Sequence, residues 1–247
     1  MKRVIKILVL IGIISFFNID MYGDDIFNIE GIKNEVKEEA ENQLTPVVKF
    51  FSAGINGGLF ASSSGKLLSV GLQANVVKVP DEGVLANAST VGSYIPIPYA
   101  YAGVRIPFIG ISGMARGLII PLEDVDKYPA VIGLGIGWET SLIPLINSKI
   151  MITYHWIANF PYLDSLSSLY PNITFSFTKI PFITPYLNAG LSYNKIVTSI
   201  TLPGDSEKFG FSKVYMNMAI GVKIFFFNLE MGILPLPSYS ISAGYSF

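Results

Sequence analysis

The stretch that decides the fold is Ser238–Phe247, which reads SYSISAGYSF. Large or apolar side chains fill its odd positions, and serine or glycine fills its even positions. A period of two is the signature of a β-strand whose two faces lie in different environments. One face of this strand suits lipid or an apolar core, and the other suits a small, polar space.

Similar short segments recur along the chain at roughly even spacing, at 66–79, 99–106, 110–120, 130–141, 147–157, 172–180, 184–195, 211–225, 227–233 and 238–247. Hydrophobic residues make up 51% of the 247 residues and charged residues only 14%, where about 25% is usual for a soluble domain. After the N-terminus, no stretch reads as a spanning helix, so the apolar content is spread over many short segments, as in a barrel. The pattern predicts an all-β fold, an antiparallel up-and-down transmembrane β-barrel of about 10 strands, with 12 as the alternative.

The connectors support a count of ten, because single-chain bacterial barrels have an even number of strands. Counted back from the last strand, the long connectors 80–98, 121–129, 158–171 and 196–210 all fall on the outer side. The short ones, around Pro107 and at 142–146, 181–183 and 225–227, all fall on the periplasmic side. Aromatic residues near segment ends, among them Tyr94, Tyr99, Tyr101, Trp138, Tyr154, Trp156, Tyr162, Tyr170, Tyr193 and Tyr239, are expected to form interfacial girdles.

The region before the barrel divides into two parts. Residues 1–23 combine basic residues with a short apolar core, as in a secretory signal peptide. Residues 24–64 form an acidic, helically spaced stretch followed by a Gly/Ser-rich segment, a periplasmic or plug region that precedes the barrel at 65–247. Pro46 is expected to end the helix. A solvated helix lying against the barrel is favoured over a plug or a periplasmic handle, and residues 51–64 are either a strand or a plug.

Several stretches resemble an uncharacterised family of bacterial outer-membrane-type β-barrel proteins. They are Gly133–Gly137, the strand at 185–191, the segment 54–60 leading into 66–68, and the C-terminal strand pair. The resemblance implies a barrel in the bacterial outer membrane, and a more distant one is to fatty-acid-transport barrels. The last strand resembles the closing strand that the barrel-assembly machinery reads, with Tyr245 and Phe247 as the membrane-insertion signal. Outer-membrane lipid and that machinery are therefore the expected partners, and the oligomeric state stays open.

The sequence offers no catalytic constellation, so no enzyme, metal site or cofactor is predicted. His155 is the only histidine and there is no cysteine, which excludes disulfides, thiolate metal sites and a lipoprotein anchor. Gly133, Gly135 and Gly137 lack the following helix of a dinucleotide site, and small inward residues of a narrow barrel explain them better. The formal net charge of −1 gives no case for nucleic acid as a partner.

Charged and titratable residues on the polar faces of the strands are the candidate lumen-lining set: Arg105, Arg116, Glu139, Lys149, His155, Lys213, Lys223 and Glu230. They suggest a narrow channel or transporter for small or hydrophobic solutes. They also fit interstrand ion pairs in a closed barrel, since the interior of an eight-stranded barrel is already filled by side chains. The alternatives are therefore a non-transporting structural or surface-interaction barrel, or a soluble periplasmic lipid-binding barrel.

Overall fold

The computed structural model describes residues 29–59, 67–86, 92–106, 108–119, 130–143, 145–158, 164–178, 180, 182–202 and 205–247. Within these ranges, the structure describes only the backbone of residues 29–36, 84, 119, 142–143, 200–202 and 205–207. The expected signal peptide at 1–23 lies outside the described residues.

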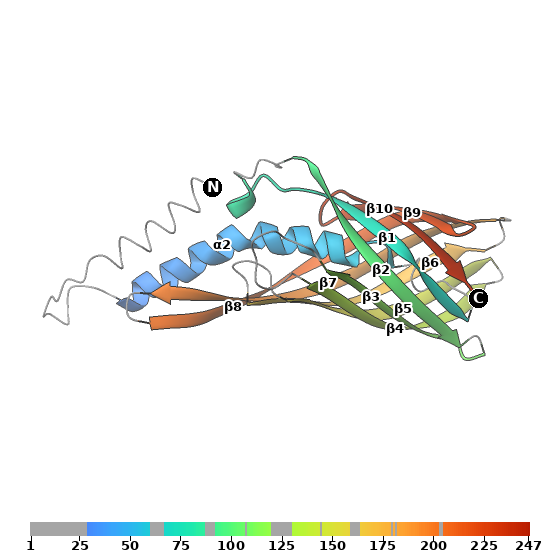
Figure 1. Cartoon of the computed structure of the whole chain (residues 1–247), viewed down its shortest axis with the longest axis horizontal. Helices are drawn as coiled ribbons and strands as arrows, with labels where there is room; N and C mark the ends of the chain where they lie inside the picture. The colour runs from blue at the N-terminus through green and yellow to red at the C-terminus, as the bar shows by residue number, and fades with distance from the viewer. Residues whose placement is uncertain are drawn as a thin grey trace, which may run out of the picture.

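The described chain folds into one closed antiparallel barrel (Figure 1), in which each strand pairs with its neighbours in sequence and β1 pairs with β10. Its strands are β1 (Leu68–Lys78), β2 (Tyr94–Ile106), β3 (Ile111–Ile119), β4 (Ala130–Ile143), β5 (Ile146–Ala158), β6 (Ser165–Phe177), β7 (Ile183–Leu202), β8 (Asp205–Ile224), β9 (Phe227–Leu234) and β10 (Ser238–Ser246). The predicted all-β, up-and-down architecture and the count of ten strands are confirmed.

The outward faces of the strands are apolar, and the inward faces are polar except at the level where α2 packs against the wall. In β10, Ser240 and Ser242 are buried while Tyr239 and Ile241 are exposed. The same holds around the barrel, where the outward Leu72 is 69% exposed and faces away from a lumen lined by serine, asparagine and threonine. Alternation alone leaves the inner face undetermined, and the structure assigns it to the polar residues.

Only some of the aromatic residues that were expected to form girdles lie on the outer face. Tyr94, Trp138, Tyr154, Trp156, Tyr193 and Tyr239 are exposed on the outer face, as a girdle requires. Tyr99, Tyr101 and Tyr170 are buried instead, so their assignment to a girdle is wrong. Alternation along their strands directs these three side chains into the lumen. Their position in the alternation, rather than their nearness to a segment end, therefore decides which face they lie on. Tyr162 lies outside the described residues.

The two ends of the barrel differ in length and composition. At one end β7 and β8, each 20 residues long, project beyond the other strands as a hairpin (Figure 1). The connector expected at 196–210 is therefore wrong, since pairing continues to Leu202 and Asp205. This stretch is rich in β-branched residues, which favour strand. We call this the hairpin end, and the opposite one, where the short connections lie, the short-turn end.

β6 also begins earlier than expected, at Ser165, within the connector placed at 158–171. Pro171 lies inside this strand, although a proline cannot donate a hydrogen bond to a neighbouring strand. The structure accommodates it by interrupting the β6–β7 register between Leu169 and Asn172, while the pairing with β5 continues through Pro171. Interrupting the pairing with β7 alone is sufficient to accommodate the proline within β6.

The helix α2 (Ile29–Asn56) is longer than predicted and runs through Pro46, so the expected stop at this proline is wrong. The favoured interpretation of a solvated helix against the barrel is also wrong for the C-terminal half. Val47, Val48 and Phe51 are buried with the barrel wall, and residues 51–56 are helical rather than strand. Burial of this apolar half offsets the hydrogen bond that a proline removes from a helix. The N-terminal half extends past the barrel beside the β7–β8 hairpin (Figure 1).

Candidate functional site: the plugged lumen

The C-terminal half of α2 is sealed to the wall by apolar packing. Val47, Val48, Phe51, Ala53 and Ile55 form one buried cluster with wall residues that include Val77, Ile97, Tyr99, Val131, Ile157, Leu166, Ile196, Phe211 and Leu236. These wall residues come from seven different strands and from Leu236, so the helix contacts much of the circumference. We call this cluster the apolar seal.

The tip of α2 reaches polar side chains farther along the lumen. The last carbonyl groups of a helix have no partner within it and carry partial negative charge. Here the wall supplies donors: Asn75 Nδ2 lies 2.5 Å from the Gly54 oxygen, and Gln73 Nε2 lies 2.9 Å from the Gly57 oxygen. Arg116 Nη1 donates to the same Gly57 oxygen at 2.9 Å. Side chains of the barrel wall, rather than residues next to the helix in sequence, therefore cap the end of α2.

An acidic residue holds the next backbone group. The Gly58 N–H donates to Glu230 Oε1 at 2.7 Å, and the Tyr186 hydroxyl donates to Glu230 Oε2 at 2.9 Å. Gly58 has φ of +67°, and a Cβ there would collide with Gln73 and Ser240, so both conformation and space require glycine. We call Arg116 and Glu230, with the Gly57 carbonyl and the Gly58 N–H that they bind, the tip latch.

His155 is a fully buried wall residue beside this latch. Its Nε2 accepts a hydrogen bond from Arg116 Nε at 3.0 Å, which requires a ring nitrogen without a proton. The guanidinium also lies over the Tyr99 ring, at 4.9 Å from its centroid. The imidazole therefore orients Arg116.

Gly133 provides the space for the His155–Arg116 contact. A Cβ at this position would collide with the His155 ring and would lie 3.1 Å from Arg116 Cγ. We expect Gly133→Val to lower the free energy of unfolding by about 1–3 kcal/mol, because overpacking forces neighbours off their rotamers. Urea unfolding in lipid vesicles measures the loss. Gly117→Val is the matched control on β3, because a Cβ there would meet only the Val131 oxygen at 3.6 Å.

The eight predicted lumen residues lie at three levels. Arg116, His155 and Glu230 meet at the tip of α2, and Lys213 lies toward the hairpin end, where its Nζ is 2.6 Å from Glu41 Oε1. Arg105, Glu139, Lys149 and Lys223 gather near the short-turn end. Strand parity would also have placed Gln73 and Asn75 inward. Nothing in the sequence pattern indicated that these two side chains cap a helix.

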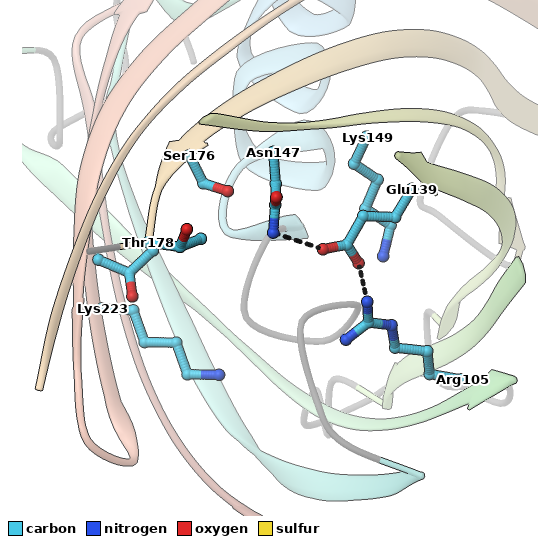
Figure 2. Close-up of a pocket in the computed structure, with 8 residues that line it drawn as sticks. Arg105, Glu139, Asn147, Lys149, Ser176, Thr178 and Lys223 are labelled. Atoms are coloured by element: carbon cyan, nitrogen blue, oxygen red, sulfur yellow. Dashed lines mark hydrogen bonds and ion pairs between the residues drawn. The ribbon is translucent and has the colours of Figure 1, made fainter. Parts of the chain in front are cut away.

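The group near the short-turn end lines a cavity of about 220 Å³ (Figure 2). The walls of this cavity also include Asn147, Ser176, Thr178 and Thr184. Arg105 Nη2 lies 3.1 Å from Glu139 Oε2, and Asn147 Nδ2 donates to Glu139 Oε1 at 3.4 Å. In Figure 2, Lys223 extends toward the cavity from the side opposite Arg105 and Lys149. We call this cavity the vestibule.

Among the described residues, no three histidine, aspartate or glutamate side chains are grouped so as to hold a metal ion. No helix in the described part of the chain is both long enough and apolar enough to cross a membrane. Comparison with protein-family models finds no match, and comparison with curated proteins finds none either.

Proposed function

We propose that this protein is an integral β-barrel of the bacterial outer membrane, and that it acts as a narrow, gated channel for small solutes. The support for the membrane is the outward apolar face, which in water would be a large exposed hydrophobic surface. A soluble lipid-binding barrel would need its apolar face inside, whereas here the exposed outer face is apolar and the only apolar level of the lumen among the described residues is filled by α2.

The composition of the short turns supports the same proposal. Except for Gly110 and Thr178, their described residues are large and apolar, and Phe108 is 97% exposed. The exposed apolar side chains of these turns are Phe108, Ile109, Leu145, Ile180, Phe182, Phe225 and Phe226, with Tyr245 and Phe247 of the last strand beside them. We call them the apolar crown. Because the crown continues the outward apolar face of the strands, we place it at the level of the lipid.

Membrane location is tested by fractionation and heat-modifiable gel mobility. We expect the protein in the outer-membrane fraction and a shift in apparent size between unheated and boiled samples, as a closed barrel gives. Recovery of the folded protein in the soluble periplasmic fraction would overturn the membrane proposal.

The observation that carries the gating proposal is the polar tip latch. Hydrogen bonds of this kind each contribute only about 0.5–3 kcal/mol net, because water replaces them when they break. A helix tip held by such bonds can withdraw from the latch into a hydrated lumen at modest cost. On this proposal α2 closes the passage in the state described, and breaking the latch opens it.

Single-channel recording in planar bilayers tests this gating. We expect the wild type to open rarely and Glu230→Gln to open more often, since the neutral amide weakens the bond from the Gly58 N–H. Ser242→Ala is the matched control, because the Ser242 hydroxyl is buried in the lumen with no hydrogen-bond partner among the described residues. Equal opening in the wild type and in Glu230→Gln would contradict the gating role.

The apolar seal favours one second candidate, a permanently closed barrel that serves as a structural or surface-interaction protein. Withdrawing Val48, Phe51 and Ile55 from the wall would expose large apolar side chains to water, at about 1.5–3 kcal/mol for each fully buried one. The same recordings decide between the two candidates. A stably folded barrel that conducts in neither the wild type nor Glu230→Gln would support the closed barrel.

A further inference from the structure

We propose that the vestibule is a binding site for a small oxyanion, a solute carrying a phosphate or carboxylate group. The first observation is its charge. Among the side chains that line it, Arg105, Lys149 and Lys223 are cationic and Glu139 is the one carboxylate. Positive charge is therefore in excess within a confined cavity of about 220 Å³. Walls of low dielectric focus such a field and raise the local concentration of anions.

The second observation is the hydrogen-bonding capacity around these cations. Asn147, Ser176, Thr178 and Thr184 bring amide and hydroxyl groups from four different positions of the wall. In addition, Arg105 Nε is buried and has no hydrogen-bond partner among the described residues, although Nη2 of the same guanidinium reaches Glu139. Cations combined with neutral donors are the chemistry that recognises phosphate and carboxylate oxygens.

The third observation is the arrangement of the cations. Figure 2 shows Arg105 and Lys149 on one side of the vestibule and Lys223 on the other, so an anion between them would be approached from opposite walls. A cavity of about 220 Å³ holds several water molecules, a size that suits phosphate or a short carboxylic acid. Glu139 lies against Arg105 and limits the excess of charge, which favours reversible binding over trapping.

Isothermal titration of the detergent-solubilised barrel with inorganic phosphate tests the proposal. We expect saturable binding in the wild type, binding about tenfold weaker in Lys223→Gln, and tighter binding in Glu139→Gln. Lys195→Gln is the matched control on β7, because Lys195 is exposed on the outer face, and its affinity should equal that of the wild type. Heat-modifiable mobility verifies that each variant is folded.

No saturable binding, or equal affinities in folded Lys223→Gln and wild type, would overturn the site. A second arm separates the two sources of a phosphate group, a free ion and a lipid headgroup. The titration is repeated in nanodiscs of phosphatidylcholine alone and of phosphatidylcholine with phosphatidylglycerol. Unchanged affinity identifies a free anion as the ligand, and weaker apparent affinity with phosphatidylglycerol identifies headgroups as occupants of the same vestibule. The proposal does not depend on gating, since binding is measured without conduction.

Discussion

Replacing Ile136 by arginine is expected to lower the free energy of unfolding in lipid vesicles by about 2–4 kcal/mol. Ile136 is 63% exposed on the outer face of β4, between Gly113 of β3 and Ile152 of β5. In a bilayer this position faces hydrocarbon, where a guanidinium loses its hydration. In water the same substitution would remove an exposed apolar side chain at little or no cost. The measured change in the free energy of unfolding therefore shows whether lipid or water surrounds the outer face.

Ser199→Arg is the matched control for this substitution. Ser199 is exposed on the β7–β8 hairpin, beyond the other strands, and its hydroxyl donates to Asp164 Oδ2 at 2.7 Å. An arginine there would lie beside a carboxylate in water, so we expect a change within about 0.5 kcal/mol. Urea unfolding followed by tryptophan fluorescence measures both variants. If Ile136→Arg costs no more than Ser199→Arg, the outer face does not lie in lipid.

The second large effect is expected for Glu230→Ala, which should lower the free energy of unfolding by about 2–4 kcal/mol. The substitution leaves the Gly58 N–H and the Tyr186 hydroxyl without their acceptor inside the barrel. It also removes a negative charge from a lumen level that contains the buried Arg116. Each of these groups was desolvated on folding, and each loses its compensation.

Glu230→Gln removes the negative charge but keeps a hydrogen-bond acceptor at this position, so it separates the two contributions. Its amide oxygen can still accept from the Gly58 N–H, so we expect a loss of only about 1 kcal/mol. The unfolding midpoints of both variants in vesicles, or their gel transition temperatures, give the comparison. A Glu230→Ala barrel as stable as the wild type would show that the tip latch does not hold α2.

The wall of the barrel could be predicted from sequence because its signal is local. Strand parity places Ser240 and Ser242 on one face and Ile241 on the other, whatever the rest of the chain does. The β7–β8 hairpin was missed because polar residues such as Ser199 read as a connector, although they belong to a strand that continues past the barrel. Composition alone does not distinguish a strand in water from a loop.

The sequence predicted that the residues of the candidate site lie in the lumen, but it did not predict which groups they contact. Arg116, His155 and Glu230 were expected inside the lumen. The partners of Arg116 and Glu230, however, are backbone groups of Gly57 and Gly58, which come from a segment with no strand pattern. The proline at position 46 misled the helix prediction, because the local cost of a proline was weighed without the burial that Val47–Asn56 gains inside the barrel. That gain depends on tertiary packing and leaves no periodic trace in the sequence.

The direction of α2 bears on the order in which the barrel assembles. The helix lies inside the barrel with its N-terminal half projecting at the hairpin end (Figure 1), whereas β1 begins at the short-turn end, where Leu67 N donates to the Phe247 oxygen. The C-terminal half of α2 therefore lies along the lumen, between the hairpin end and the level of the tip latch. If β1 and β10 joined first, the N-terminal half of α2 would have to be drawn through a closed ring. Joining β1 to β10 after α2 is in place would avoid this threading.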